Sequence, residues 1–162
     1  MIRIGLISDT HLFSTSKPLP DLVFSTFENC SQILHAGDIL CEEVLISLEK
    51  IAPVTAVAGN NDPQILAEKL GFQKEIQIGN RSICLLHGHE GYGSALQNVV
   101  RFSKKSVSDI FVFGHSHQPV FFEENQKYFI NPGSAVQRRF QPKCSVAILD
   151  ISDQVKVGFV YF

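Results

Sequence analysis

Short apolar runs alternate with polar or glycine-containing turns along most of the chain. Continuous apolar runs of about four to eight residues between turn residues are typical of buried β-strands. In the first two thirds of the sequence this pattern predicts strands over residues 2–7, 32–35, 54–58, 74–78, 81–86 and 109–113.

Between these strands the apolar residues recur at helical spacing. Asp21 begins the first of these segments, where an N-cap carboxylate would satisfy free backbone amides. Glu42 and Glu43 fall in the first turn of the second segment, where the helix dipole favours them, and Pro53 ends it. The spacing predicts helices over residues 21–27, 42–51, 63–70 and 94–105.

From Pro119 onward the pattern changes to antiparallel strands joined by turns. Gly79-Asn80 already forms a two-residue hairpin turn upstream, since both residues tolerate positive φ. The late strands are predicted at 119–122, 128–131, 145–151 and 155–161, with turns at 123–127 and 152–154. Alternating strands and helices followed by hairpins predict a single α/β domain over residues 1–162, with two stacked mixed β-sheets flanked by helices.

Composition supports a globular chain and excludes several classes of partner. The 162 residues are 44% hydrophobic and 19% charged, which is enough to bury a core. The formal net charge of −2 supplies no basic field, so nucleic acid is an unlikely partner. No apolar run reaches the roughly 18 residues that span a membrane, and the first residues do not resemble a signal peptide. Cysteines are scattered without a Cys-x-x-Cys pair, which favours reduced thiols and a cytoplasmic location.

Residues with metal-ligand side chains follow five of the predicted strands. The five segments are Asp9-Thr10-His11, Gly37-Asp38, Gly59-Asn60, His87-Gly88-His89 and Gly114-His115-Ser116-His117. Because ligands collect at the carboxyl edge of open α/β sheets, we expect these side chains to meet at one rim.

The donor set within these segments suits two metal ions, since three or four such donors already hold one. It consists of Asp9, His11, Asp38, Asn60, His87, His115 and His117. Mixed nitrogen and oxygen ligands without thiolate favour manganese, iron, zinc or nickel over calcium or magnesium. Two such ions about 3.5–4 Å apart, joined by a carboxylate, would acidify a shared water and draw charge from phosphoryl oxygens. The segments therefore predict a hydrolase acting on phosphoesters.

In this order the segments resemble the blocks of the calcineurin-like metallophosphoesterase superfamily. The short chain, the His87-Gly88-His89 form and the segment Tyr128–Ser134 resemble its compact branch, related to the phosphodiesterase YfcE. The resemblance implies a phosphodiesterase that hydrolyses a small phosphodiester by attack of a bimetal-bridging hydroxide. It also implies two divalent transition metal ions, with Mn²⁺ preferred and Ni²⁺, Fe²⁺ or Zn²⁺ as alternatives.

The resemblance further implies which residues hold each ion, with Asp38 as the bridge. The first ion would take Asp9, His11, Asp38 and His117. The second ion would take Asp38, Asn60, His87 and His115.

Asn61 departs from the pattern of the family. Many members have a histidine after the metal-binding asparagine, and the compact branch often has cysteine there. An asparagine donates hydrogen bonds but cannot act as a general acid near neutral pH. We therefore expect Asn61 to position phosphate and the chain to hydrolyse activated or acidic leaving groups best.

Further site residues follow from the same resemblance. From the residues alone, His89 could replace His87 as a ligand. The resemblance puts the ligand at His87 and His89 near the substrate or behind the ligands, so Asp38, Asn61 and His89 form the predicted catalytic set. Arg138 and Arg139 are candidate phosphate contacts together with Asn61, because guanidinium matches phosphate geometry. A solvated surface pair is the alternative for both arginines, and the sequence does not choose between them.

Other conspicuous residues have simpler interpretations. His35 is expected to be a histidine at a strand end rather than a ligand. Glu123-Glu124 is expected to be a solvated turn, and Pro132-Gly133-Ser134 either a structural turn or part of the site wall. Phenylalanines are expected mostly in the core, with Phe13 as a candidate for the site wall; those considered are Phe13, Phe121, Phe122, Phe129 and Phe140.

Two other functions fit the same sequence. A phosphomonoesterase or nucleotide phosphatase would use the same metal ligands, because the choice between mono- and diester lies in the pocket walls. A non-catalytic interaction scaffold of the same fold is the second alternative, and the full set of seven ligand residues argues against it. Compact relatives often form dimers or higher oligomers, so the resemblance leaves a homo-oligomer open, but no stretch of the sequence predicts an interface.

Overall fold

The first of two β-sheets contains both ends of the chain. In the computed structural model, which describes residues 1–13 and 17–162, this sheet has the strand order β10-β9-β1-β2-β3. Its strands are β1 (Ile2–Ile7), β2 (Gln32–His35), β3 (Val54–Ala56), β9 (Ser145–Ile151) and β10 (Val155–Tyr161). Since β1, β2 and β3 are parallel, their carboxyl ends lie at one edge of the sheet.

The second sheet has the order β4-β5-β6-β8-β7. Its strands are β4 (Gln73–Ile78), β5 (Arg81–Leu86), β6 (Ile110–Val112), β7 (Val120–Glu124) and β8 (Lys127–Asn131). The three inner strands β5, β6 and β8 are parallel, and the outer strands pair antiparallel with them. Each sheet therefore delivers three parallel strand ends.

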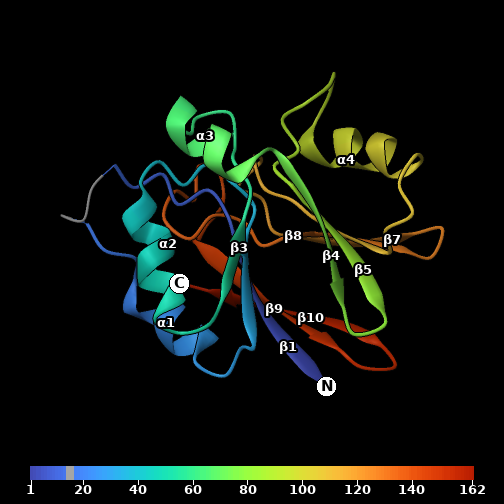
Figure 1. Cartoon of the computed structure of the whole chain (residues 1–162), viewed down its shortest axis with the longest axis horizontal. Helices are drawn as coiled ribbons and strands as arrows, with labels where there is room; N and C mark the ends of the chain where they lie inside the picture. Colours follow the sequence, from blue (N-terminus) through green and yellow to red (C-terminus); the bar gives the residue numbers. More distant parts are fainter. Residues whose placement is uncertain (14–16) are drawn as a thin grey trace.

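Helices cover the outer faces of both sheets (Figure 1). The helices are α1 (Asp21–Phe27), α2 (Glu42–Glu49), α3 (Gln64–Leu70) and α4 (Ala95–Ser103). Phe27 of α1 and Leu48 of α2 pack on the first sheet, and Val99 of α4 packs on the second. The predicted α/β class, with two stacked mixed sheets flanked by helices, is confirmed.

Alternation along the strands builds the core between the sheets. Ile4 and Leu6 of β1 point into the cluster that also holds Ile83 and Val112 of the second sheet. Gly5, between them, faces the opposite way, and a Cβ there would meet the ring of Phe27 at 2.8 Å. Period-two burial on the first strand thus separates the inter-sheet core from the helix-facing core.

Several predicted boundaries are corrected by backbone pairing. Glu123 and Glu124 belong to β7, opposite Tyr128 and Lys127, so the predicted turn at 123–127 shrinks to two residues. Both glutamates are nevertheless exposed. Asn125 and Gln126 alone make the turn, with positive φ values of 52° and 63°, the geometry of a tight hairpin.

Of two other local predictions, one needs correction. The N-cap of α1 is Pro20 and no side chain caps it, so Asp21 lies in the first turn and acts there through the helix dipole. At the upstream hairpin, Ile78 pairs with Arg81, and Gly79 takes a positive φ of 59°. The two-residue loop is as predicted.

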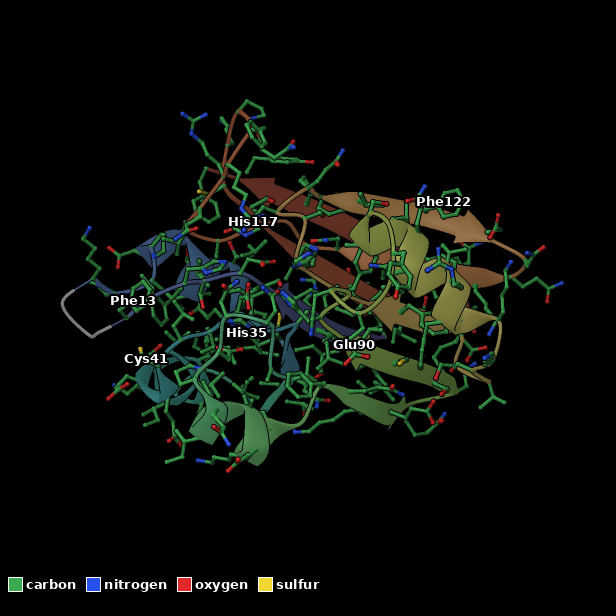
Figure 2. The ribbon with its side chains drawn as sticks, turned by 90° about the horizontal axis from the view of Figure 1, so that it is seen from above. Phe13, His35, Cys41, Glu90, His117 and Phe122 are labelled. Atoms are coloured by element: carbon green, nitrogen blue, oxygen red, sulfur yellow. The ribbon has the colours of Figure 1, made fainter. Side chains whose placement is uncertain are left out.

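The phenylalanines are less buried than composition suggested. Phe129 is buried, whereas Phe13 and Phe140 are 84% and 99% exposed. Phe121 and Phe122 are on the edge strand β7, which no further strand covers, and they remain partly exposed. Figure 2 shows Phe13 and Phe122 on opposite sides of the molecule. Among the described helices, none is long and apolar enough to cross a membrane.

Candidate metal centre

The predicted ligand segments follow the parallel strands and adopt an unusual backbone. Glycine is the residue that normally occupies the left-handed region, because a Cβ makes it costly. Here the positive φ values fall on predicted ligands: Asp9 (53°), His11 (47°), Asp38 (56°), His115 (68°) and His117 (58°). Strain of this kind gathers at functional sites, where it re-aims side chains.

Asp9 is fully buried directly after β1. Its Oδ2 accepts hydrogen bonds from Ser8 Oγ at 2.7 Å and from the His115 backbone amide at 3.0 Å. Its Oδ1 is buried without a hydrogen-bond donor. Gly114 makes this approach feasible, since a Cβ there would lie 1.9 Å from Ser8 Oγ. One oxygen thus fixes the carboxylate and the other remains free to bind a cation.

His87 offers a second buried atom without a partner. Its Nδ1 donates to the carbonyl of Ala36 at 2.7 Å, which leaves the lone pair of a neutral ring on Nε2. That Nε2 is buried, has no hydrogen bond, and lies 3.4 Å from Asp38 Oδ2 and 4.0 Å from Asp9 Oδ1. Three electron-pair donors facing one another need a positive charge between them.

His11 and His117 face each other in a similar way. Their Nε2 atoms lie 3.2 Å apart, and His117 Nε2 lies 3.3 Å from Asp9 Oδ1. The Nδ1 of His117 donates to the carbonyl of Gln137, so its Nε2 is again the atom available to a ligand. Asp38 Oδ2 lies 3.5 Å from His11 Nε2.

The donor atoms form two overlapping groups. Within each group, all donor atoms lie within 4.8 Å of one another. One group is Asp9, His11 and His117, and the other is Asp9, Asp38 and His87. Asp9 therefore belongs to both groups, while Asp38 lies between His11 and His87. Each group offers three donor atoms that could hold a metal ion, and the two groups share Asp9.

The titration behaviour of the centre reflects its need for positive charge. Burial raises the pKa of the Asp9 carboxyl, but His11 and His117 lower it more, so that its pKa lies well below the ordinary range. Burial likewise raises the pKa of Asp38, and contacts with His87 and Asn61 reverse that effect. For His87, burial lowers the pKa and Asp38 raises it above its ordinary value. Both carboxylates are thus held ionised.

Asn60 and His115 stand at the open side of this cluster. Asn60 is exposed, and its Oδ1 accepts from His115 Nδ1 at 3.0 Å. The His115 ring lies 5.2 Å from that of His87, and burial lowers the pKa of His115. All seven predicted ligands are therefore at one rim, five of them in the two tight groups.

Asn61 binds Asp38 rather than pointing away from the protein. Its backbone amide donates to Asp38 Oδ1 at 2.8 Å and its side-chain amide to Oδ2 at 2.7 Å. In this arrangement Asn61 orients the central carboxylate, a role that the sequence did not suggest. Because its side chain is exposed, it also borders the space above the cluster.

Asp62 is the supporting residue that sequence reasoning missed. Its carboxylate accepts four backbone amides, those of Asp38 (3.0 Å), Ile39 (2.8 Å), Leu40 (2.7 Å) and Gly59 (2.7 Å). It thereby ties the loop after β2 to the loop after β3. The signal was its place in the run Gly59-Asn60-Asn61-Asp62, directly behind two asparagines.

His35 and His89 occupy different surroundings. His35 is fully buried, accepts from the Gly37 amide and contacts Thr10 Oγ1, and burial lowers its pKa to about 3. Both ring nitrogens are used, so the prediction that His35 is not a ligand agrees with its contacts. His89 lies outside the two groups, with its ring 5.4 Å from that of His87, and burial lowers its pKa.

The arginines differ in what they reach. Arg139 donates to the carbonyl of His115 at 3.3 Å, whereas Arg138 donates to Gln141 in its own loop. Both are exposed. Of the two, only Arg139 contacts a ligand loop directly.

The turn Pro132-Gly133-Ser134 is buried and holds the ligand loops from behind. Ser134 Oγ donates to the carbonyl of Asp9 at 2.7 Å, and Asn131 Nδ2 donates to that of Gly114 at 2.7 Å. These bonds run to backbone atoms. Of the two interpretations of this turn, the structural one fits its contacts.

Comparison with known proteins found one matching family, similar sequences and similar solved structures. The calcineurin-like phosphoesterase superfamily domain matches residues 2–154. The chain is 33% identical over 158 residues to the probable metallophosphoesterase MJ0623 of Methanocaldococcus jannaschii, covering 97% of this chain and 80% of that protein. It is 30% identical over 150 residues to phosphodiesterase MJ0936 of the same organism, covering 82% and 83%. Wild-type Vps29 of Entamoeba histolytica, solved in complex with zinc, superposes with a TM-score of 0.80 at 26% identity over 99% of both chains.

Proposed function

Because the chain belongs to the calcineurin-like phosphoesterase superfamily, we propose that it is a metal-dependent phosphodiesterase that hydrolyses a small phosphodiester. The observation that carries this proposal is the pair of buried atoms without hydrogen-bond partners, Asp9 Oδ1 and His87 Nε2, within one cluster of donors. Two buried electron-pair donors that lie within 4.0 Å of each other without a hydrogen bond cost free energy, and a cation bound between them would remove that cost.

The residues of the cluster fit a pair of divalent transition metal ions. Asp9, His11, Asp38 and His117 would hold the first ion. Asp38, Asn60, His87 and His115 would hold the second ion. The ions supply Lewis acidity, which activates water for attack on phosphorus and draws charge from the phosphoryl oxygens. The donors are imidazole, carboxylate and amide oxygen without thiolate, which suits manganese, iron, zinc or nickel. Among these, the resemblance to the family favours manganese.

The other residues of the site orient these ligands and the substrate. Asn61 holds Asp38 through two hydrogen bonds, and Asp62 fixes the backbone on either side. Arg139 lies on the His115 loop, where its guanidinium is within reach of a bound phosphate. His89 lies beside His87 and would face the organic part of the substrate.

The similarity to MJ0936, which is named a phosphodiesterase, supports diesters rather than monoesters as the substrate class of this chain. Phosphomonoester hydrolysis at the same site is the alternative, because metal ligands do not distinguish the two. A non-catalytic scaffold is the second alternative, and the fold shared with Vps29 does not distinguish it from an enzyme. Strained ligand backbone and unpaired buried donor atoms argue for catalysis, since an interaction surface requires neither.

The test is direct hydrolysis by the manganese-loaded protein. Bis-p-nitrophenyl phosphate and p-nitrophenyl phosphate are compared for wild type, for Asp38→Ala and for the matched control Asp153→Ala, whose aspartate is exposed far from the cluster in sequence. We expect the diester to be preferred and Asp38→Ala to lose at least about 100-fold in kcat/KM. Equal rates for wild type and Asp38→Ala would remove the enzyme proposal, and a strong monoester preference would replace it with the alternative.

A further inference from the structure

A cavity of about 360 Å³ lies beside the metal centre. Its walls come from the start of β4, the end of β5, the loop after β5 and helix α4. In Figure 2, Glu90 of this wall lies nearer to α4 than the labelled His35 and His117 do. Cavities of this size accommodate small organic ligands.

Two histidines join the cavity to the centre. His87 and His89 are both part of its wall. The His89 ring lies 5.4 Å from the ring of His87 and 6.2 Å from that of His115. The cavity is therefore within reach of one of the two organic groups of a phosphodiester that binds at the cluster.

One part of the wall is apolar and partly aromatic. It contains Phe72, Leu86, Val99 and Phe102. The ring of Phe72 meets His89 edge-on, with centroids 5.8 Å apart. Phe72 is nevertheless 45% exposed, so part of its ring surface is free to contact a ligand. Aromatic side chains prefer such edge and offset contacts with other planar rings.

Charge narrows the ligand further. Among the lining residues that the structure describes, Glu90 is the single carboxylate, and none is lysine or arginine. A second phosphate or a carboxylate on the ligand would find no cation there and would meet Glu90 instead. The cavity is thus unsuited to a group that carries a negative charge.

We propose that this cavity binds an aromatic group of the phosphodiester substrate that carries no negative charge, either an aryl ring or a nucleobase. Phe72 is the specificity-determining residue of this subsite, because it presents the exposed ring surface at the entrance. The assignment rests on the proposed phosphodiesterase function for its link to the phosphate, but binding to the cavity can be measured without turnover.

Binding is tested by NMR on the full chain loaded with zinc, which is diamagnetic. Benzyl alcohol and adenosine serve as uncharged probes of the aryl and nucleobase classes. We expect saturable shifts of the backbone amides of Gln73, Gly88 and Glu90 with at least one probe. Phe72→Ala should weaken the affinity for that probe at least about fivefold. Phe121→Ala, which removes a ring of matched exposure (44%) from edge strand β7, should leave the affinity unchanged.

Inhibition links the cavity to the phosphate. Against bis-p-nitrophenyl phosphate, benzylphosphonate should inhibit at least about tenfold more tightly than methylphosphonate, and 4-carboxybenzylphosphonate should lose that advantage. The advantage should shrink in Phe72→Ala and persist in Phe121→Ala.

The outcomes separate this proposal from the function on which it rests. Diester hydrolysis with equal inhibition by the benzyl and methyl compounds would overturn the subsite and leave the phosphodiesterase standing. Saturable probe binding in a protein that hydrolyses no diester would remove the phosphodiesterase and retain the ligand class of the cavity. Absence of saturable shifts with both probes, or shifts indifferent to Phe72→Ala, would overturn the subsite in either case.

Discussion

At the residue scale, the metal centre depends on side chains that use only one of their two polar ends. Asp9 Oδ2 accepts hydrogen bonds from Ser8 and His115, and His87 Nδ1 donates one to the carbonyl of Ala36. The remaining end of each is buried and unpaired. Because one end is fixed, the other end is already oriented. The side chain therefore loses less conformational entropy when a cation binds. His117 follows the same rule through Gln137.

Asn61 gives a prediction about leaving groups. In wild type its amide holds Asp38 but supplies no proton near neutral pH. Asn61→His should gain at least about tenfold in kcat/KM on diesters with poor alkyl leaving groups, relative to p-nitrophenyl diesters, because imidazole can protonate a departing alkoxide. Steady-state kinetics over a leaving-group series measures this. Asn61→Ala is the control, and equal changes on both classes of ester would contradict the idea.

His35 gives a prediction about the pH dependence of stability. Burial lowers its pKa from 6.5 to about 3, so the unfolded chain binds a proton over this range that the folded chain does not. The contribution is therefore present above pH 6.5 and is lost as pH falls toward 3. The lowered pKa values of Asp9 and Asp38 act only below their unfolded value of 3.8.

The measurement is urea denaturation of wild type and His35→Gln with a chelator present. The stability advantage of wild type should shrink by about 2 kcal/mol between pH 7 and pH 5, at roughly 1.4 kcal/mol per pKa unit. A difference between the two proteins that stays constant with pH would show that His35 does not resist protonation.

At the element scale, short loops after strands are made rigid by bonds to their backbone. Asp62 binds the loops after β2 and β3, and Ser134 binds the backbone of Asp9 after β1. Asn131 binds the loop after β6 through the carbonyl of Gly114. Such loops would otherwise be the mobile part of the fold, and these bonds hold the ligand geometry that catalysis requires.

Lys127 plays a comparable part at the end of α4. Its Nζ donates to the carbonyls of Ser103 (3.1 Å), Ser106 (2.6 Å) and Ser108 (3.1 Å), and it lies over the Phe111 ring. A cation near the carboxyl end of a helix satisfies free carbonyls and complements the dipole.

Replacing this ammonium should destabilise the protein. Lys127→Met keeps most of the apolar stem and removes the donors, so we expect a loss of roughly 1–3 kcal/mol in the free energy of unfolding. Lys105→Met, on the exposed segment after α4, should change it by less than about 0.5 kcal/mol. Chemical denaturation compares them, and a similar effect of both changes would contradict a specific role.

At the scale of the whole molecule, the site exists because two sheets bring their parallel strand ends to one place. Asp9, Asp38 and Asn60 follow β1, β2 and β3 of the first sheet. His87 and His115 follow β5 and β6 of the second. Neither sheet alone supplies either complete predicted ligand set, so metal binding should couple the two sheets.

Metal should therefore raise the thermal stability of the entire fold. Mn²⁺ at about 100-fold over its dissociation constant should add about 2.7 kcal/mol, which moves Tm by roughly 5–10 °C in a chain of this length. Asp38→Ala should lose most of this shift, and Asp153→Ala should keep it. Calorimetric scans with Mn²⁺ and with chelator measure it, and an unchanged Tm in wild type would contradict a specific metal site.

Local patterns in the sequence were sufficient to predict the elements and the segments whose side chains meet at one rim. Continuous apolar runs between turn residues located the strands, and helical spacing of apolar residues located the helices. The five segments after strands located the donors, because parallel strand ends must share an edge. The predicted ends of strands and turns were less accurate, as at Glu123 and Glu124, because cross-strand pairing decides where a strand stops.

The tertiary structure alone decided which partners each of those residues has. It put Asp62 under four backbone amides from two loops, and it turned Asn61 toward Asp38. It left Phe140 exposed although its type suggested the core, and it placed the cavity of Phe72 beside His89. These are contacts between segments far apart in the chain. Their geometry follows from how two sheets and their loops pack, which no local pattern of hydrophobic and polar residues encodes.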